Sequence, residues 1–258
     1  MKLLVVGAGE MGRWLADTVA AADEPTAETA FLDADPSVAA DAAANRDARQ
    51  VDAKTTERFE CVCLAVPMSA VEPAIEQYAP LADRAIFDLS GVMDRPLAAL
   101  HTHAPDCERA SFHPLFAPPR VPGNVAVVTA SNGPVLTAIR NAMAAAGNTV
   151  FETTAEEHDR AMETVQAGAH TAILAYALVA DDVREAFATP VSTKLTEIAT
   201  TVTEGSPEVY AEIQSTFDGA DAVADAAAAI AAADDEAFAD LYETAKEHVG
   251  GERRERHG

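Results

Sequence analysis

The segment SFHPLFAPPR, residues 111–120, combines an imidazole with an unusually rigid backbone. His113 stands between Phe112 and Pro114, and two further prolines precede Arg120. Because proline fixes its φ angle, a side chain in such a loop is held in place at little ordering cost. A neutral imidazole, with an ordinary pKa of about 6.5, accepts protons well at neutral pH. The segment therefore makes His113 a candidate for a positioned proton acceptor. The alternative is a histidine that only caps a strand-to-loop junction.

A glycine pattern with the spacing G-x-G-x-x-G lies near the N-terminus, in VVGAGEMG. An apolar run precedes it and a helical pattern follows, as a dinucleotide-binding turn requires. The first glycine permits the tight turn, the second lets the backbone approach a pyrophosphate, and the third allows the helix to pack closely on the strand. The helix N-terminus then faces the phosphate charge. We expect cofactor contacts from the whole turn: Gly7, Ala8, Gly9, Glu10, Met11 and Gly12. A nucleotide-free glycine turn is the alternative.

Asp33 follows the second apolar run, where a carboxylate accepts hydrogen bonds from the ribose hydroxyls of a dinucleotide. No arginine or lysine stands beside it in LDADPS, so a 2′-phosphate would meet negative charge without a compensating cation. The pattern therefore favours NAD over NADP. Val66 and Pro67 end the apolar run LAVP, and we expect them beside the nicotinamide.

The charge is strongly acidic, with 42 acidic residues against 18 basic ones and a net charge of −24. The acids are dispersed, which argues against nucleic acid or an anionic membrane as partner. No apolar run is long enough for a membrane span. We interpret the surface as salt-adapted (halophilic), since molar salt shortens the Debye length to about 3 Å. Cys61, Cys63 and Cys107 carry no paired spacing, and Cys61 and Cys63 are expected as small apolar side chains of a buried strand. We expect a cytoplasmic protein, and no His, Cys and Asp cluster at ligand spacing suggests a metal.

Short apolar runs alternate with helical patterns over the first part of the chain. Strands are expected at KLLVVGA, TAFLDAD, CVCLAVP, RAIFDLS and NVAVVTA, with helices between them. Such a pattern predicts a parallel sheet covered on both faces. From about Glu156 onward the helical period continues almost throughout. The sequence thus predicts an α/β protein with a Rossmann-type doubly wound sheet over residues 1–152, an all-helical domain over 153–250 and a frayed tail over 251–258.

Three further segments resemble the prephenate dehydrogenase family. HPLFAP resembles its H-P-M-F-G-P segment, EEHDRAMETVQAGAH its first helical segment, and GSPEVYAEIQ its D-P-x-L-Y-x-D-I stretch. Order and spacing agree over nearly the whole chain. The resemblance is greatest to the dehydrogenase part of the bacterial fusion enzymes that also carry chorismate mutase. Neither a mutase segment nor a C-terminal regulatory domain is expected with this chain.

The resemblance implies NAD-dependent oxidative decarboxylation of prephenate to 4-hydroxyphenylpyruvate in tyrosine biosynthesis. A hydride leaves C4 of the ring for NAD, the ring alcohol becomes a ketone, and carbon dioxide is lost as the ring aromatises. The resemblance places the general base on His113 and substrate contacts on His170 and Gln166. It assigns His158 and Asp159 to the junction between domains rather than to the substrate, and it implies a homodimer built through the helical domain.

Two positions depart from the family's pattern. The family has D-x-x-S-V-K after this strand, and an ungapped alignment puts Gly91 in place of the serine. Ser90, one residue earlier, is then the candidate to contact the ring hydroxyl and the catalytic histidine. The family's substrate-binding arginine falls on Thr193. Lys194 and Arg120 are then the candidate cations for the substrate carboxylates, although a lysine lacks the bidentate fork of an arginine.

Three alternative functions remain open. Loss of the arginine is compatible with arogenate, whose side chain carries a compensating ammonium. Other dehydrogenases of the same two-domain architecture use a helical-domain lysine with an asparagine four residues on, and VQAGAHTAILAYAL contains neither. A non-catalytic NAD-binding regulatory module is the alternative from a different class.

Overall fold

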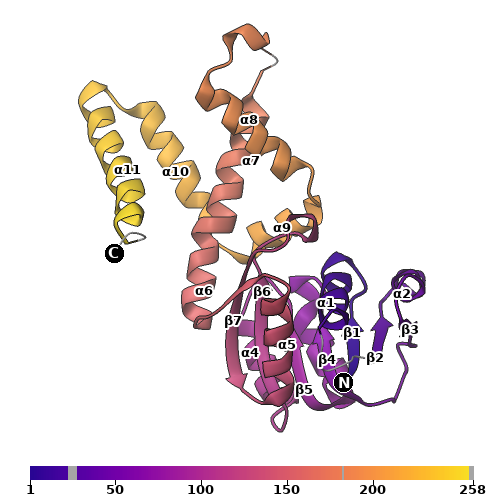
Figure 1. Ribbon diagram of the computed structural model, residues 1–258. Coiled ribbons are helices and arrows are strands. Elements are labelled where there is room, and N and C mark those ends of the chain that lie inside the picture. Colours follow the sequence, from indigo (N-terminus) through magenta and orange to yellow (C-terminus); the bar gives the residue numbers. More distant parts are fainter. Residues whose placement is uncertain (23–27, 182, 256–258) are drawn as a thin grey trace. The chain divides into compact units, whose positions relative to one another are not determined.

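The structure, a computed structural model, describes residues 1–22, 28–181 and 183–255 (Figure 1). The chain divides into two compact units, Met1–Met162 and Glu163–Gly258. The division lies ten residues beyond the boundary expected at 152, because the helix that follows the sheet packs within the first unit.

Unit 1 contains an eight-stranded sheet in the order β3-β2-β1-β4-β5-β6-β7-β8. Its strands are β1 (Lys2–Val6), β2 (Glu28–Leu32), β3 (Ala48–Gln50), β4 (Phe59–Leu64), β5 (Ala82–Asp88), β6 (Glu108–Pro114), β7 (Asn124–Ser131) and β8 (Thr149–Glu152). The first six strands are parallel and have the order of a doubly wound dinucleotide-binding fold. The carboxyl ends of β1, β4, β5 and β6 therefore lie along one edge of the sheet.

One strand runs against the expected direction. The sequence predicts NVAVVTA as part of a parallel sheet, but β7 pairs with β6 in antiparallel orientation. Only residues 115–123 connect these two strands, and a parallel crossover needs a dozen or more residues. The chain therefore turns straight back, and β8 then pairs in parallel with β7.

Helices cover both faces of the sheet, as the apolar strands predict. They are α1 (Glu10–Ala20), α2 (Pro36–Ala44), α3 (Val71–Tyr78), α4 (Asp94–His103), α5 (Pro134–Ala145) and α6 (Ala155–Met162). Side-chain alternation along β1 separates two cores: Leu3 and Val5 pack in the cluster with α1, α2 and α5, whereas Leu4 and Val6 pack in the cluster with α3 and α4. Cys61 of β4 is buried in the first core, which confirms its expected apolar role.

Unit 2 is entirely helical in its described part. It comprises a π-helical turn (Glu163–Gly168) and the helices α7 (Ala169–Val179), α8 (Pro190–Thr203), α9 (Pro207–Thr216), α10 (Gly219–Ala232) and α11 (Asp235–Glu255). A Cβ placed on Gly219 would lie 2.0 Å from the carbonyl oxygen of Glu163, so only glycine lets α10 start this close to the π-helical turn.

The C-terminal segment is more helical than the sequence predicts. α11 continues to Glu255, through the first five residues of the segment expected to be frayed, and residues 256–258 lie outside the described residues. In the described ranges, no helix combines the length and the apolar character that crossing a membrane requires.

Candidate active site

The glycine turn after β1 has the geometry that its spacing predicts. Gly7 has a φ of 95°, and a Cβ there would lie 2.2 Å from the carbonyl oxygen of Ala65. A Cβ on Gly12 would lie 2.0 Å from the carbonyl oxygen of Gly7. Gly9 differs, because a Cβ on it would meet no atom within 4 Å. Protein packing thus requires the first and third glycines, whereas the second borders open space that a phosphate can approach.

The residues around this turn fit a dinucleotide. Gly9 is the N-cap of α1 and receives no side-chain cap, so the helix N-terminus offers backbone donors to an anion. The Asp33 carboxylate, just beyond β2, accepts hydrogen bonds from the backbone N–H groups of Ala8 at 2.7 Å and Asp35 at 3.0 Å. Val66 packs against the turn, with its Cγ1 3.3 Å from the Cβ position of Gly7. The predicted cofactor residues that gather here are Gly7, Ala8, Gly9, Glu10, Met11, Gly12, Asp33, Val66 and, exposed at the next position, Pro67.

His113 is a strand residue and not a loop residue as the sequence suggested. It is the second last residue of β6, pairs with Ala126 of β7 and is only 7% exposed. Pro114 ends β6, whereas the later prolines belong to the connection to β7, which is anchored by an edge-to-face contact between Phe116 and Trp14 of α1. The β6–β7 ladder therefore fixes the backbone of His113, in addition to the proline neighbours.

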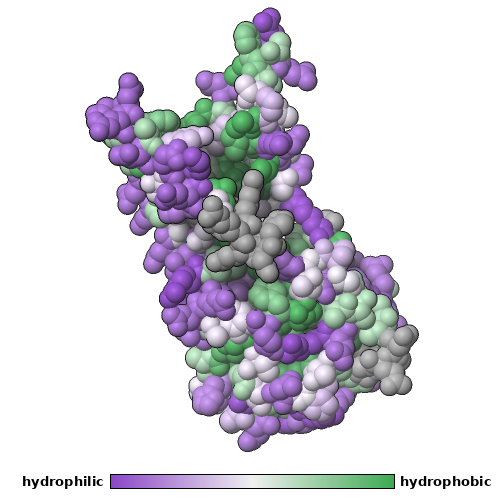
Figure 2. Space-filling model, turned by 60° about the vertical axis from the view of Figure 1, so that its left-hand side comes forward, coloured by the Kyte–Doolittle hydropathy of each residue, from purple (hydrophilic) through white to green (hydrophobic). Residues whose placement is uncertain are grey.

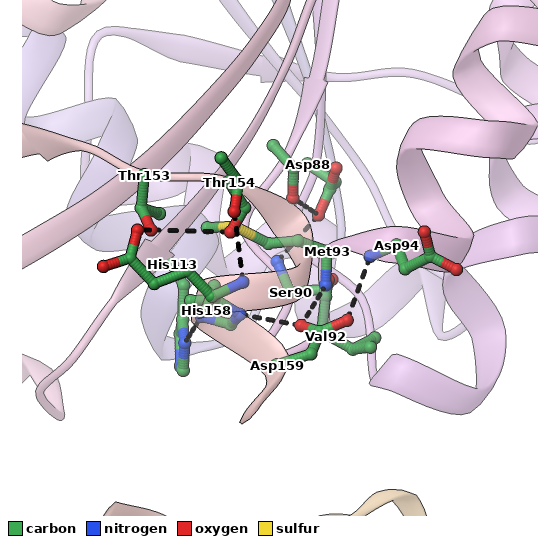
Figure 3. A network of polar contacts seen from close by, with 12 residues as sticks. Asp88, Ser90, Val92, Met93, Asp94, His113, Thr153, Thr154, His158 and Asp159 are labelled. Carbon is green, nitrogen blue, oxygen red and sulfur yellow. Dashed lines mark hydrogen bonds and ion pairs between the residues drawn. The ribbon is translucent and has the colours of Figure 1, made fainter. Parts of the chain in front are cut away.

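His113 begins a chain of hydrogen bonds (Figure 3). Its Nδ1 lies 2.8 Å from Nε2 of His158, and Nδ1 of His158 lies 2.7 Å from Oδ1 of Asp159. The Asp159 carboxylate also accepts the backbone N–H groups of Met93 at 3.0 Å and Asp94 at 3.2 Å, where α4 begins. The sequence assigned His158 and Asp159 to a domain junction. Their adjacency in the E-H-D element gave no sign that they reach back to His113.

The turn after β5 brings Gly91, and not the Ser90 side chain, beside the imidazole of His113. A Cβ on Gly91 would lie 3.6 Å from Nε2 of His113 and 3.0 Å from Sδ of Met68. The Ser90 hydroxyl donates to the carbonyl oxygen of Val92 at 2.7 Å, and the Ser90 N–H donates to Asp88 at 3.0 Å. Ser90 thus shapes the turn that places Gly91 beside the imidazole.

Burial controls protonation at this site. Burial lowers the pKa of His113 to about 3, with a smaller contribution in the same direction from His158 and an opposing one from Asp159. Its imidazole is therefore neutral at physiological pH and able to accept a proton. Burial would raise the pKa of Asp159, but the hydrogen bonds from His158, Met93 and Asp94 together hold it below its ordinary value. Asp159 is therefore an anion.

The substrate residues predicted in unit 2 fall into two groups. His170 of α7 is half-buried, and its ring packs edge to face on Tyr210 of α9 with 4.8 Å between centroids. Gln166 lies half-buried in the π-helical turn that precedes α7. Thr193 and Lys194 are exposed on α8.

Arg120, the other candidate cation, is exposed in a short 3-10 turn of unit 1 (Pro118–Arg120). Within the described part of the chain, neither Arg120 nor Lys194 makes an ion pair, so both cations are available to a ligand. Nor do three potential metal ligands of the His, Cys, Asp or Glu type gather anywhere in those ranges.

The sequence of this chain is similar to that of a named dehydrogenase. Over 202 residues it is 30% identical to 4-amino-4-deoxyprephenate dehydrogenase of Streptomyces pristinaespiralis, which covers 71% of this chain and 68% of the relative. The chain belongs to the prephenate dehydrogenase family. Members of this family are oxidoreductases. A comparison with family models found no match to the sequence.

Solved structures of prephenate and arogenate dehydrogenases have the same fold as this chain. Prephenate dehydrogenase of Aquifex aeolicus, in complex with hydroxyphenyl propionate and NAD+, superposes with a TM-score of 0.73 at 16% identity and covers 99% of this chain and 98% of its own. Synechocystis arogenate dehydrogenase gives a TM-score of 0.67 at 14% identity, covering 98% and 99%. At these identities the similarity establishes the fold, a Rossmann-type sheet followed by helices.

Proposed function

We propose that this chain is an NAD-dependent dehydrogenase that converts prephenate to 4-hydroxyphenylpyruvate by oxidative decarboxylation. The observation that carries the proposal is a buried, neutral imidazole on the same sheet edge as a dinucleotide-type glycine turn. His113 is the second last residue of β6, and β6 lies two strands from β4, which corresponds to roughly 10 Å at ordinary strand spacing. That span suits a base and a nicotinamide that act on opposite sides of one ring carbon.

The cofactor proposal is supported by the residues of the turn. The open side of Gly9 and the uncapped N-terminus of α1 would hold the pyrophosphate, and the Asp33 carboxylate would accept the ribose hydroxyls. A carboxylate at this point disfavours a 2′-phosphate. When bound, NAD+ supplies the hydride acceptor. Val66 and Pro67, at the end of β4, would border the nicotinamide.

His113 supplies proton transfer. As a hydride leaves C4 of the substrate, the ring hydroxyl becomes a carbonyl and its proton must pass to an acceptor. A neutral imidazole next to the reacting carbon takes that proton in the transition state, an effect worth roughly 10²–10⁴-fold in rate. The C1 carboxylate then leaves as carbon dioxide, and its bonding electrons complete the aromatic ring and place negative charge on the oxygen at C4. That oxygen takes the proton back from the imidazolium, which gives the phenol and restores the neutral base.

The substrate is a dicarboxylate, and the protein carries a net charge of −24. Binding such an anion needs cations, and Lys194 and Arg120 are the candidates without ion pairs in the described ranges. We assign substrate contacts to His170 and Gln166 as well, with Thr193 beside Lys194. Arogenate, whose side-chain ammonium would offset the missing arginine, is the alternative substrate in the same reaction.

A second candidate substrate is 4-amino-4-deoxyprephenate, after the relative at 30% identity. One feature of the site favours it. The group beside Nε2 of His113 is Gly91, and the neighbouring Ser90 hydroxyl donates to Val92. Nε2 of His113 can accept a hydrogen bond from the substituent at C4, whereas the Ser90 hydroxyl is not free to donate one to it. This arrangement suits a protonated amine at C4, because an ammonium donates hydrogen bonds and accepts none.

We also propose a homodimer formed through unit 2. α7 is apolar on all sides, yet none of its residues is buried, and Leu178 and Val179 are 86% and 78% exposed. Figure 2 shows green apolar surface among the helices of this unit. A helix that is apolar all round is normally covered, which a second copy would achieve. Light scattering in molar salt tests this, and Leu178→Glu should yield monomers.

The activity test is NADH formation with each of the three substrates in molar salt. We expect turnover with prephenate, and His113→Asn should lower kcat by roughly 10²–10⁴-fold while NAD+ still binds. Turnover of 4-amino-4-deoxyprephenate alone would select the second candidate. Tight NAD+ binding without turnover of any substrate would indicate a regulatory module instead, and a near-wild-type rate in His113→Asn would remove the base from its role.

A further inference from the structure

We propose that His158 and Asp159 are positioning residues that fix the tautomer of His113, so that its Nε2 presents a lone pair to the substrate. The inference rests on the proposed function in one respect, the use of His113 as the base. It follows from the order of donors and acceptors along the chain Asp159, His158 and His113.

The first step is the anchor. Asp159 is an anion and can only accept hydrogen bonds. Its two oxygens are held by backbone N–H groups of Met93 and Asp94, the first donors of α4, so the carboxylate cannot swing away from His158. The positive end of the α4 dipole also favours the negative charge at this position.

The second step concerns His158, whose side chain is only 1% exposed. In the proposed pattern His158 is a neutral imidazole, which carries one N–H. Because the carboxylate can only accept, that N–H must lie on Nδ1, 2.7 Å from Asp159. Nε2 of His158 is then an acceptor.

The third step passes this polarity to His113. Its Nδ1, 2.8 Å from Nε2 of His158, must be the donor in that hydrogen bond. The lone pair of the neutral ring is then on Nε2, the atom that points to Gly91. After Nε2 takes the substrate proton, the ring is positive, and the anionic Asp159 stabilises that charge through the neutral His158.

One other protonation pattern fits the same distances. If His158 were an imidazolium, both its nitrogens would donate, His113 would accept at Nδ1 and its own proton would sit on Nε2. The base would then be blocked toward the substrate. The two patterns differ in the position of a single proton, which can be measured without turnover.

The first measurement is ¹⁵N NMR of the histidine-labelled full chain in molar salt, with the His113 ring signals assigned by their loss in His113→Asn. We expect neutral His113 to carry its proton on Nδ1, and Asp159→Asn to move part of the population to Nε2–H. A wild-type His113 protonated on Nε2 overturns the proposal, whatever the turnover.

The second measurement is kinetic. Asp159→Asn should lower kcat roughly 10- to 100-fold, a part of the general-base effect, with the KM values for NAD+ and substrate changed about twofold or less. His158→Gln, whose Oε1 still accepts from Nδ1 of His113, should retain more activity than His158→Leu. His101→Gln, on the exposed side of α4, is the matched control.

The outcomes separate the two proposals. If the wild-type chain turns over no substrate, the proposed function fails, and the NMR result alone decides the tautomer. If the wild type is active and folded Asp159→Asn retains the full kcat, the positioning role fails. Thermal unfolding of each variant distinguishes loss of positioning from loss of fold, and equal kcat in folded His158→Gln and His158→Leu would also contradict the proposal.

Discussion

The Asp33 carboxylate accepts a hydrogen bond from the backbone N–H of Ala8, with 2.7 Å between Oδ2 and the nitrogen. This bond ties the end of β2 to the glycine turn after β1, two segments that are 25 residues apart. Because a carboxylate oxygen has a second lone pair, the same side chain can hold the turn and accept a ribose hydroxyl. Under the proposed function, Asp33 therefore connects the fold to cofactor choice.

We predict that Asp33→Asn raises the KM for NAD+ roughly tenfold to a hundredfold, because charge-assisted hydrogen bonds to the ribose are lost. The same substitution should reduce the preference of the enzyme for NAD+ over NADP+. Steady-state kinetics with both cofactors measures this. Asp83→Asn, exposed at the start of β5 and paired with Arg58, is the control and should leave both KM values unchanged. An unaltered NAD+ preference in Asp33→Asn would contradict the assignment.

The glycines of the turn offer a matched pair. Gly7→Ala forces a Cβ into the Ala65 carbonyl at a φ of 95°, so we expect it to lower the free energy of unfolding by about 2 kcal/mol or more. Gly9→Ala should leave that free energy within about 0.5 kcal/mol but weaken NAD+ binding, since its Cβ occupies the space left for phosphate. Chemical denaturation and cofactor titration separate the two effects. Equal destabilisation by both variants would argue against a cofactor role for Gly9.

Local patterns in the sequence predicted much of this architecture. The run KLLVV buries alternate side chains in two cores because both faces of a parallel strand are covered. The glycine spacing predicted a tight turn in which positions 7 and 12 have no room for a side chain. Both features depend on residues close together in the chain, which is why the sequence was sufficient.

Contacts between distant segments could not be predicted in this way. The direction of β7 depends on the length of one connection, and the contact between His113 and His158 joins residues 45 positions apart. Ser90 was a candidate partner for the base on sequence position alone. Only the path of the backbone after β5, a turn shaped by the hydrogen bonds of Ser90, shows that Gly91 takes that place.

Two substitutions test which cation binds the substrate carboxylates. Lys194→Ala should raise the KM for the substrate roughly tenfold to a hundredfold with little effect on NAD+, because losing one charged hydrogen bond costs roughly 1.5–3 kcal/mol. Arg120→Ala should show the same effect if that residue meets the carboxylate instead. Lys246→Ala, on α11 and paired with Glu243, is the control for net charge. If only Arg120→Ala affects the substrate KM, the assignment moves to unit 1.

Asp88 should make stability depend on pH in an unusual direction. Burial raises its pKa to about 7 from an ordinary 3.8, so the folded state binds more protons than the unfolded state between these values. Its contribution to stability is complete below the unfolded value and is lost as pH rises to 7, by at most about 1.4 kcal/mol per unit. In Asp88→Asn the amide oxygen can still accept from Ser90 and Ser111. Unfolding of both proteins from pH 4 to 8 should show this extra slope in the wild type only; parallel curves would contradict it.

The net charge of −24 leads to a prediction about salt. Repulsion among dispersed acids opposes the compact state, and it is largely screened when the Debye length falls to about 3 Å at molar ionic strength. We expect the melting temperature to fall steadily as sodium chloride is reduced from molar to millimolar concentrations. Sucrose stabilises proteins by exclusion without screening charge, so it serves as the control and should restore only part of the loss. Potassium chloride at equal ionic strength should act like sodium chloride. A melting temperature that is unchanged by salt would remove the case for adaptation to concentrated salt, and full rescue by sucrose would show that exclusion, and not screening, stabilises the fold.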